Sequence, residues 1–209
     1  VLIIRDPRAV VASIHRGSGG TYANSGLSIL HILRCWRKSV AYAICFAGSP
    51  GFHWMTYETL AHDPGTCLEP IAKAFDLAKF PESSLSGVLK SQDGSTWRGN
   101  SSFYAADDKR PHFDKLLDAE TIAFIDTICH AEMVWLDIEH TELPTEYALE
   151  NFRDPFQPEK LGLSEEEKRE ERYRFSLLRK DVVTSQDAET WFVYPSVQEQ
   201  LRSGLYPKC

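Results

Sequence analysis

The sequence predicts an α/β protein built on a parallel sheet. Residues 1–4 form a short, continuous apolar run that is followed by a turn and a helical segment. Residues 52–56, which follow Pro50-Gly51, predict a second strand, which also leads into helical segments. The run at residues 1–4, which is apolar throughout and rich in β-branched side chains, is typical of a parallel strand that is buried on both faces. A long apolar segment over residues 27–47 predicts a mostly buried helix between the two strands.

The first stretch has the order strand, tight turn, helix. Residues 1–4 predict a strand buried on both faces, and Arg5 ends it. Asp6 is a suitable helix N-cap and Pro7 suits the first helical position, so a helix is expected as far as Arg16. Ligands of α/β sheets bind at the carboxyl ends of the strands, and a helix N-terminus favours an anion. The turn is therefore a candidate anion site.

Ser13 follows Asp6 by seven residues, which is close to two helical turns. We therefore expect Arg5 and Ser13 to converge on one phosphate, the arginine as a charged fork and the serine as a neutral donor. Arg5-Asp-Pro-Arg followed by Ser13 resembles the 3′-phosphate-binding motif of sulfotransferases, which use PAPS (3′-phosphoadenosine 5′-phosphosulfate). The alternative is an ordinary strand-to-helix turn with a solvated arginine.

A second stretch is similar to sulfotransferases in the same order along the chain. The strand at 52–56 runs into Tyr57-Glu-Thr-Leu, and Asp63-Pro64 then opens an amphipathic helix. In that family a tyrosine at this place lies beside the adenine, which implies the same role for Tyr57. Taken without the first motif, Tyr57 is an ordinary aromatic residue at a strand end.

A third stretch is the polar loop 93–103, which contains Arg98, Gly99 and Asn100. By location and chemistry it resembles the late, basic, glycine-containing loop that closes over the nucleotide in sulfotransferases. The resemblance implies that these three residues contact the cofactor. The loop lacks the lysine of the Arg-Lys-Gly found in cytosolic members. A plain surface loop is the alternative.

The resemblance covers about residues 1–137 and implies both a fold and an activity. The fold is a P-loop-like three-layer α/β fold with a central parallel sheet, represented here by its carboxyl-terminal part. The activity is transfer of a sulfuryl group from PAPS to a hydroxyl or amine, releasing PAP (adenosine 3′,5′-bisphosphate). The acceptor is a small molecule or a hydroxyl group of a glycan or peptide.

The family's 5′-phosphosulfate loop and its usual catalytic His or Glu precede the first motif. We therefore assign no catalytic base in this chain. The sequence has no initiator methionine and begins inside a strand, which predicts the carboxyl-terminal part of a longer protein. A companion chain that carries the missing amino-terminal half is the other possibility.

The composition of the chain limits the kinds of partner that we expect. The formal net charge of −7 argues against a nucleic-acid partner, because such proteins present basic patches. No apolar run approaches the length of a membrane span. The five cysteines have no metal-site spacing, so we expect thiols and no metal: Cys35, Cys45, Cys67, Cys129 and Cys209.

Two further helices and a division of the chain are expected. Residues 118–136 predict a helix capped by Asp118, and residues 1–140 form the α/β part. Residues 141–209 predict a charged, largely helical extension, in which Ser164 and Glu167 form a capping box. The i,i+4 pairs expected on this helix are Glu165–Arg169 and Glu170–Arg174.

The helix predicted over residues 27–47 also carries a basic face. Arg34, Arg37 and Lys38 share it through their spacing of three and four residues. We expect this face to meet solvent. The alternative is that it attracts an anionic acceptor or cofactor.

Two other functions remain open at the level of the sequence. A P-loop-type nucleoside or small-molecule kinase also places such turns near phosphates and would prefer ADP or ATP with Mg²⁺. A non-catalytic, sulfotransferase-like subunit of an assembly would use the charged extension as its contact surface.

Overall fold

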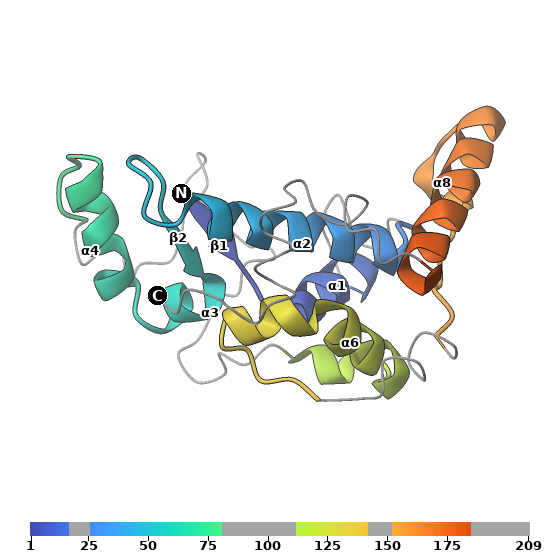
Figure 1. The fold of residues 1–209 in the computed structure, drawn as a ribbon, viewed down its shortest axis with the longest axis horizontal. Coiled ribbons are helices and arrows are strands. Elements are labelled where there is room, and N and C mark those ends of the chain that lie inside the picture. The colour runs from blue at the N-terminus through green and yellow to red at the C-terminus, as the bar shows by residue number, and fades with distance from the viewer. Residues whose placement is uncertain (17–25, 81–111, 142–151, 185–209) are drawn as a thin grey trace, which may run out of the picture. The chain divides into compact units, whose positions relative to one another are not determined.

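The computed structural model describes residues 1–16, 26–80, 112–141 and 152–184 and is a helix-rich α/β structure with a two-stranded parallel sheet (Figure 1). The general α/β class is thereby confirmed. The elements are β1 (Leu2–Ile4), α1 (Pro7–Arg16), α2 (Ile29–Phe46), β2 (Trp54–Thr56), α3 (Tyr57–His62), α4 (Pro64–Ala74), α6 (Ala119–Trp135) and α8 (Glu165–Thr184), with the 3₁₀ helices η1 (His112–Lys115) and η2 (Pro158–Leu161).

The chain divides into two compact units. The first unit comprises Val1–Arg5 and Phe46–Pro111, and the second comprises Asp6–Cys45 and His112–Cys209. The division expected at residue 140 stays a prediction.

The sheet belongs to the first unit. β1 and β2 lie side by side and run parallel, with Leu2 opposite Trp54 and Ile4 opposite Thr56. Ile4 is 2% exposed, whereas Ile3, whose side chain lies on the other face, is 51% exposed. The prediction of a strand buried on both faces was therefore wrong for the described residues, because they cover only one face of this pair.

Two capped helices follow β2. Thr56 Oγ1 accepts a hydrogen bond from the Thr59 N–H at 3.1 Å and so caps α3. Asp63 caps α4 by accepting from the Thr66 N–H at 3.1 Å, and Pro64 occupies the first turn, as predicted. The two helices and the strand share a small core of Met55, Leu60 and Ile71, with Cys67 and Leu68 packed against it.

The core of the second unit is formed by α1, α2 and α6. The expected helices over 27–47 and 118–136 are confirmed, and Asp118 caps α6 by accepting from the Thr121 N–H at 2.8 Å. Apolar side chains from all three helices are buried completely, namely Val11, Leu33, Val40, Ala41, Ala43, Ile125, Cys129 and Met133.

Residues 152–157 return to the N-terminus of α2. The Asp154 carboxylate accepts from the N–H groups of Ile29 and Leu30 at 3.2 and 3.0 Å. Phe152 stacks on Phe124 of α6 with ring centroids 3.8 Å apart. This segment thus caps one core helix and adds an aromatic side chain against another.

The capping box of α8 is confirmed. The Ser164 N–H donates to Glu167 Oε2 at 2.8 Å, and the Glu167 N–H donates to Ser164 Oγ at 3.3 Å. The Glu170–Arg174 pair is present at 3.2 Å, whereas Glu165 pairs with Lys168 at 2.7 Å.

The expected partner of Glu165 was Arg169, so that prediction was wrong. Residues three and four apart are both neighbours on a helix surface, and Lys168 takes the i+3 place.

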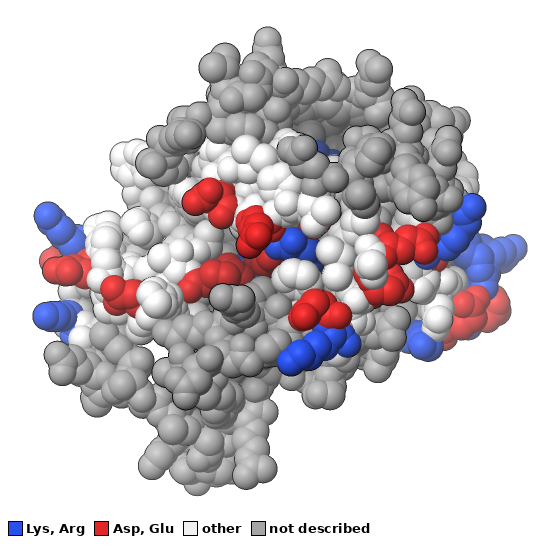
Figure 2. All heavy atoms as spheres, turned by 90° about the horizontal axis from the view of Figure 1, so that it is seen from below, with Lys and Arg blue, Asp and Glu red and all other residues white. Residues whose placement is uncertain are grey.

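Acidic and basic side chains are interspersed on the face shown in Figure 2.

Cys35, Cys45, Cys67 and Cys129 are free thiols. Within the described ranges, none of the helices is both long and apolar enough to cross a membrane.

Candidate functional site

The register of the sheet brings Arg5 and Tyr57 together. Ile4 is the last residue of β1 and pairs with Thr56, the last residue of β2. Arg5 and Tyr57 are the next residues of two parallel strands, so both leave the sheet at its carboxyl edge. Sequence reasoning had placed the two residues in separate motifs, and the parallel pairing makes them neighbours.

The two side chains are in direct contact. The guanidinium carbon of Arg5 lies 4.8 Å from the centre of the Tyr57 ring, within the range of a cation–π interaction. Both residues are half-buried. Such a contact contributes about 0.5–2 kcal/mol, depending on how far the cation is desolvated. Chemically, the pair offers a fixed positive charge beside an aromatic surface at the edge of a sheet where ligands bind.

The N-terminus of α1 is occupied by its own capping residue. Asp6 Oδ1 accepts from the Arg8 N–H at 2.8 Å, and the Asp6 carbonyl accepts from the Val10 N–H at 3.0 Å. Pro7 has no N–H to offer. An anion at this end of α1 would therefore meet the Asp6 carboxylate, and the expected attraction by the helix terminus is offset by a like charge.

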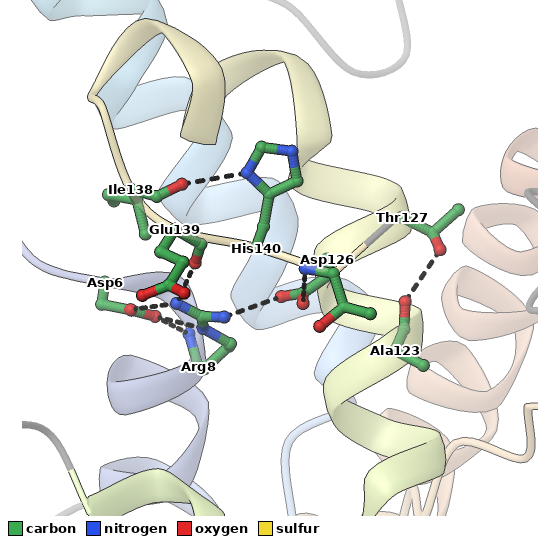
Figure 3. Close-up of polar contacts among 9 residues, drawn as sticks. Asp6, Arg8, Ala123, Asp126, Thr127, Ile138, Glu139 and His140 are labelled. Carbon is green, nitrogen blue, oxygen red and sulfur yellow. Dashed lines mark hydrogen bonds and ion pairs between the residues drawn. The ribbon is translucent and has the colours of Figure 1, made fainter. Parts of the chain in front are cut away.

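Arg8 is the centre of a buried ionic cluster, which consists of Asp6, Arg8 and Asp126 (Figure 3). Arg8 Nε and Nη2 donate to the two Asp6 carboxylate oxygens at 3.0 and 2.7 Å, a bidentate pairing. Arg8 Nη1 lies 3.3 Å from Asp126 Oδ1, and Nη2 donates to the Glu139 carbonyl at 2.6 Å. The guanidinium carbon also lies 4.4 Å from the centre of the Phe113 ring.

The cluster raises the pKa of both Arg8 and Asp126. Burial raises the pKa of Asp126. The hydrogen bond from the Thr141 N–H and the charge of Arg8 lower this pKa, but by less than burial raises it. For Arg8, burial acts to lower the pKa, but the hydrogen bond and charge of Asp6 and the charge of Asp126 raise it. Both pKa values are therefore raised, which favours the charged form of Arg8, shared between two carboxylates, and the neutral form of Asp126, whose side chain is completely buried.

The ionic cluster joins the first turn of α1 to α6 and to the segment that follows α6. Sequence reasoning missed it. The available signal was Asp126, a charged residue within the apolar repeat of the helix expected over 118–136, since a buried charge requires a partner. The identity of the partner could not be read from spacing, because Arg8 precedes Asp126 by more than a hundred residues.

A second buried pair corrects the expectation for the basic face of α2. Arg37 Nε donates to Glu132 Oε1 at 2.5 Å, and the Glu132 side chain is completely buried. The other carboxylate oxygen of Glu132 has no hydrogen-bond partner in the part of the chain that the structure describes. The prediction that this basic face meets solvent was therefore wrong for Arg37, whose side chain is 13% exposed and pairs with a buried carboxylate; Arg34 and Lys38 are also partly buried.

The remaining predicted site residues are placed as follows. Ser13 lies half-buried on α1, in the second unit, whereas Arg5 belongs to the first, and their convergence on one phosphate stays a prediction. Arg98, Gly99 and Asn100 lie outside the described residues. Among the residues that the structure describes, no group of three or more His, Cys, Asp or Glu side chains could hold a metal ion.

Comparisons with protein-family models, with curated proteins and with solved structures find no match to this chain.

Proposed function

We propose that this chain forms the nucleotide-binding side of a PAPS-dependent sulfotransferase. The observation that carries the proposal is the Arg5–Tyr57 contact at the carboxyl edge of two parallel strands. The contact supplies a cation and an aromatic surface at the places where the sequence resembles the family's 3′-phosphate and adenine sites. The finer fold, a P-loop-like arrangement of three layers, is part of the same proposal.

In the proposed reaction the acceptor oxygen or nitrogen attacks the sulfur of PAPS. A bond forms between the acceptor and sulfur, the bond between sulfur and the bridging phosphate oxygen breaks, and PAP leaves with that electron pair. The acceptor's proton passes to a base, a role to which no residue of this chain is assigned. The role of this chain is to hold the nucleotide. Arg5 and Ser13 bind the 3′-phosphate, Tyr57 lies beside the adenine, and Arg98, Gly99 and Asn100 close over the phosphate. The acceptor is a hydroxyl or amine.

Calorimetric titration of PAP and of ADP into the purified chain tests the proposal. We expect PAP to bind in preference to ADP, with or without Mg²⁺. Arg5→Ala should weaken PAP binding by about 10- to 100-fold, because a hydrogen bond to a charged group contributes about 1.5–3 kcal/mol. Arg169→Ala, which removes an exposed arginine of α8, is the matched control and should leave PAP binding unchanged.

Three results would reject the proposal. Equal binding of PAP and ADP, or binding of ADP with Mg²⁺ alone, would favour a P-loop-type kinase. Absence of binding by either nucleotide would favour a non-catalytic subunit. An equal loss in Arg5→Ala and Arg169→Ala would mean that only the net charge matters.

A further inference from the structure

Cys35 and His31 form an exposed thiol–imidazole pair on α2. The residues are four apart and therefore lie on the same face of the helix. Cys35 Sγ lies 3.7 Å from His31 Nε2, and both residues are exposed to solvent. The pair plays no part in the proposed nucleotide site, and neither residue contributes to the buried core.

The charges around this pair are mostly positive. Arg34 and Lys38 lie on the same helix as Cys35, and Glu171 of α8 lies near His31. The hydrogen bond from His31 lowers the pKa of the Cys35 thiol, and the charges of His31, Lys38 and Arg34 lower it further. The same hydrogen bond raises the pKa of His31, and the charge of Glu171 acts in the same direction. Both shifts favour a thiolate beside an imidazolium.

The other described thiols have different surroundings. Burial raises the pKa of Cys45 and of Cys67, and raises that of Cys129 well above its ordinary value. Because the thiolate is the nucleophilic form of cysteine, these three thiols are expected to react slowly at neutral pH. Cys35 is therefore chemically distinct from them both in exposure and in its neighbours.

We propose that Cys35 is a covalent modification site that forms a mixed disulfide with an anionic, low-molecular-weight disulfide. The Cys35 thiolate attacks one sulfur of that disulfide, a new S–S bond forms, the original S–S bond breaks, and the second half leaves as a thiolate. His31 stabilises the attacking thiolate. Arg34 and Lys38 attract the carboxylates of the co-reactant. The exchange needs no other oxidant, because the disulfide is itself the oxidised partner.

The test is the rate of modification of each cysteine, measured by peptide mass spectrometry on the full chain. The probes are neutral iodoacetamide, which reports the thiolate, and oxidised glutathione, which carries carboxylates. We expect Cys35 to react at least about threefold faster than Cys45 and Cys67 near pH 6.5, with the advantage shrinking near pH 9.5, where a larger fraction of the other two thiols is ionised.

Two variants separate the contributions of the neighbours. His31→Gln should remove most of the advantage of Cys35 with both probes near pH 6.5. Lys38→Gln should slow the reaction with oxidised glutathione by more than it slows the reaction with iodoacetamide, and added salt should have the same effect. Cys67→Ser is the matched control and should leave the rate at Cys35 unchanged.

Equal rates at Cys35, Cys45 and Cys67 near pH 6.5 would overturn the proposal. The proposal would also be overturned if Cys35 kept the same rate advantage over the other cysteines in His31→Gln and at high pH. That result would mean that the advantage comes from solvent exposure alone. Circular dichroism of each variant shows whether the helices are retained. A His31→Gln protein with native helicity and an unchanged rate would contradict the role of the imidazole.

Discussion

Arg37 and Glu132 form an ion pair between two core helices, with Nε of the arginine 2.5 Å from a carboxylate oxygen whose side chain is completely buried. Removing one member of a buried pair leaves the other charge without its counter-ion in an apolar setting. The packing of α2 against α6 therefore depends on this ion pair as well as on apolar contacts.

The first prediction concerns this pair. Arg37→Met should lower the free energy of unfolding by about 3–5 kcal/mol, because the buried Glu132 carboxyl group then lacks this partner. The double variant Arg37→Met/Glu132→Leu should lose less than the sum of the two single variants. Urea unfolding followed by tryptophan fluorescence reports the effect, since Trp36 is buried on α2. Additive losses in the double variant would contradict this coupling.

The second prediction is a dependence of stability on pH that comes from Asp126. Burial raises its pKa in the folded chain above the ordinary value of 3.8, so the folded state binds its proton more tightly than the unfolded state. Its favourable contribution is therefore complete below pH 3.8 and is lost as pH rises through the folded pKa. Asp126→Asn should remove this component.

The measurement is urea unfolding of wild type and Asp126→Asn at several pH values between about 4 and about 7. The stability of the wild type relative to the variant should decline as pH rises through that window. Asp114→Asn, which changes an exposed aspartate of η1, is the control for a general effect of charge. A relative stability that increases with pH would show that Arg8, and not burial, dominates the ionisation of Asp126.

The third prediction separates backbone strain from a steric clash. Gly26 has φ = +78° and its carbonyl accepts from the Gln157 N–H, while a Cβ added there would lie 2.4 Å from the Gln157 carbonyl oxygen. Gly162 has a similar φ of +65°, but nothing lies within 4 Å of an added Cβ. Gly162→Ala should lower the free energy of unfolding by about 1–2 kcal/mol, because alanine disfavours the left-handed conformation. Gly26→Ala should lower the free energy of unfolding by clearly more, because the steric clash adds to the backbone strain.

Thermal unfolding of the two alanine variants compares these costs directly. Equal losses would mean that the contact between Gly26 and the residues near 157 contributes nothing beyond the backbone conformation. In that case the segment that caps α2 could move aside without a measurable penalty.

The fourth prediction tests the aromatic half of the proposed nucleotide site. Tyr57→Phe keeps a ring beneath Arg5 and should bind PAP within about threefold of wild type. Tyr57→Leu removes the ring and should weaken binding by about tenfold, in line with the 1–3 kcal/mol that an aromatic side chain contributes by stacking on a base. Calorimetry with PAP provides the measurement. Tyr42→Leu, at an exposed tyrosine of α2, is the matched control.

An equal loss of PAP binding in Tyr57→Phe and Tyr57→Leu would assign the contribution to the hydroxyl group. An unchanged affinity in both variants would remove Tyr57 from the proposed site. Either result leaves the test of Arg5 intact, because that test depends on the charge of the phosphate.

The sequence by itself determined the local elements of this protein. Asp63 with Pro64, Asp118, and Ser164 with Glu167 marked three helix starts, because capping depends on residues within one turn of each other. Apolar periodicity located α2 and α6 for the same reason. The sequence also identified Arg5 by its position after a strand, and Tyr57 through the resemblance to sulfotransferases.

Only the tertiary structure decided which distant residues meet. The parallel register places Arg5 beside Tyr57, and helix packing places Arg8 beside Asp126 and Arg37 beside Glu132. These contacts join residues that are far apart in the sequence. A periodic pattern of side chains describes one helix or strand and does not identify a partner on another element. The exposure of Ile3 was missed for a related reason, because an apolar run shows that a side chain can be buried and not what lies against it.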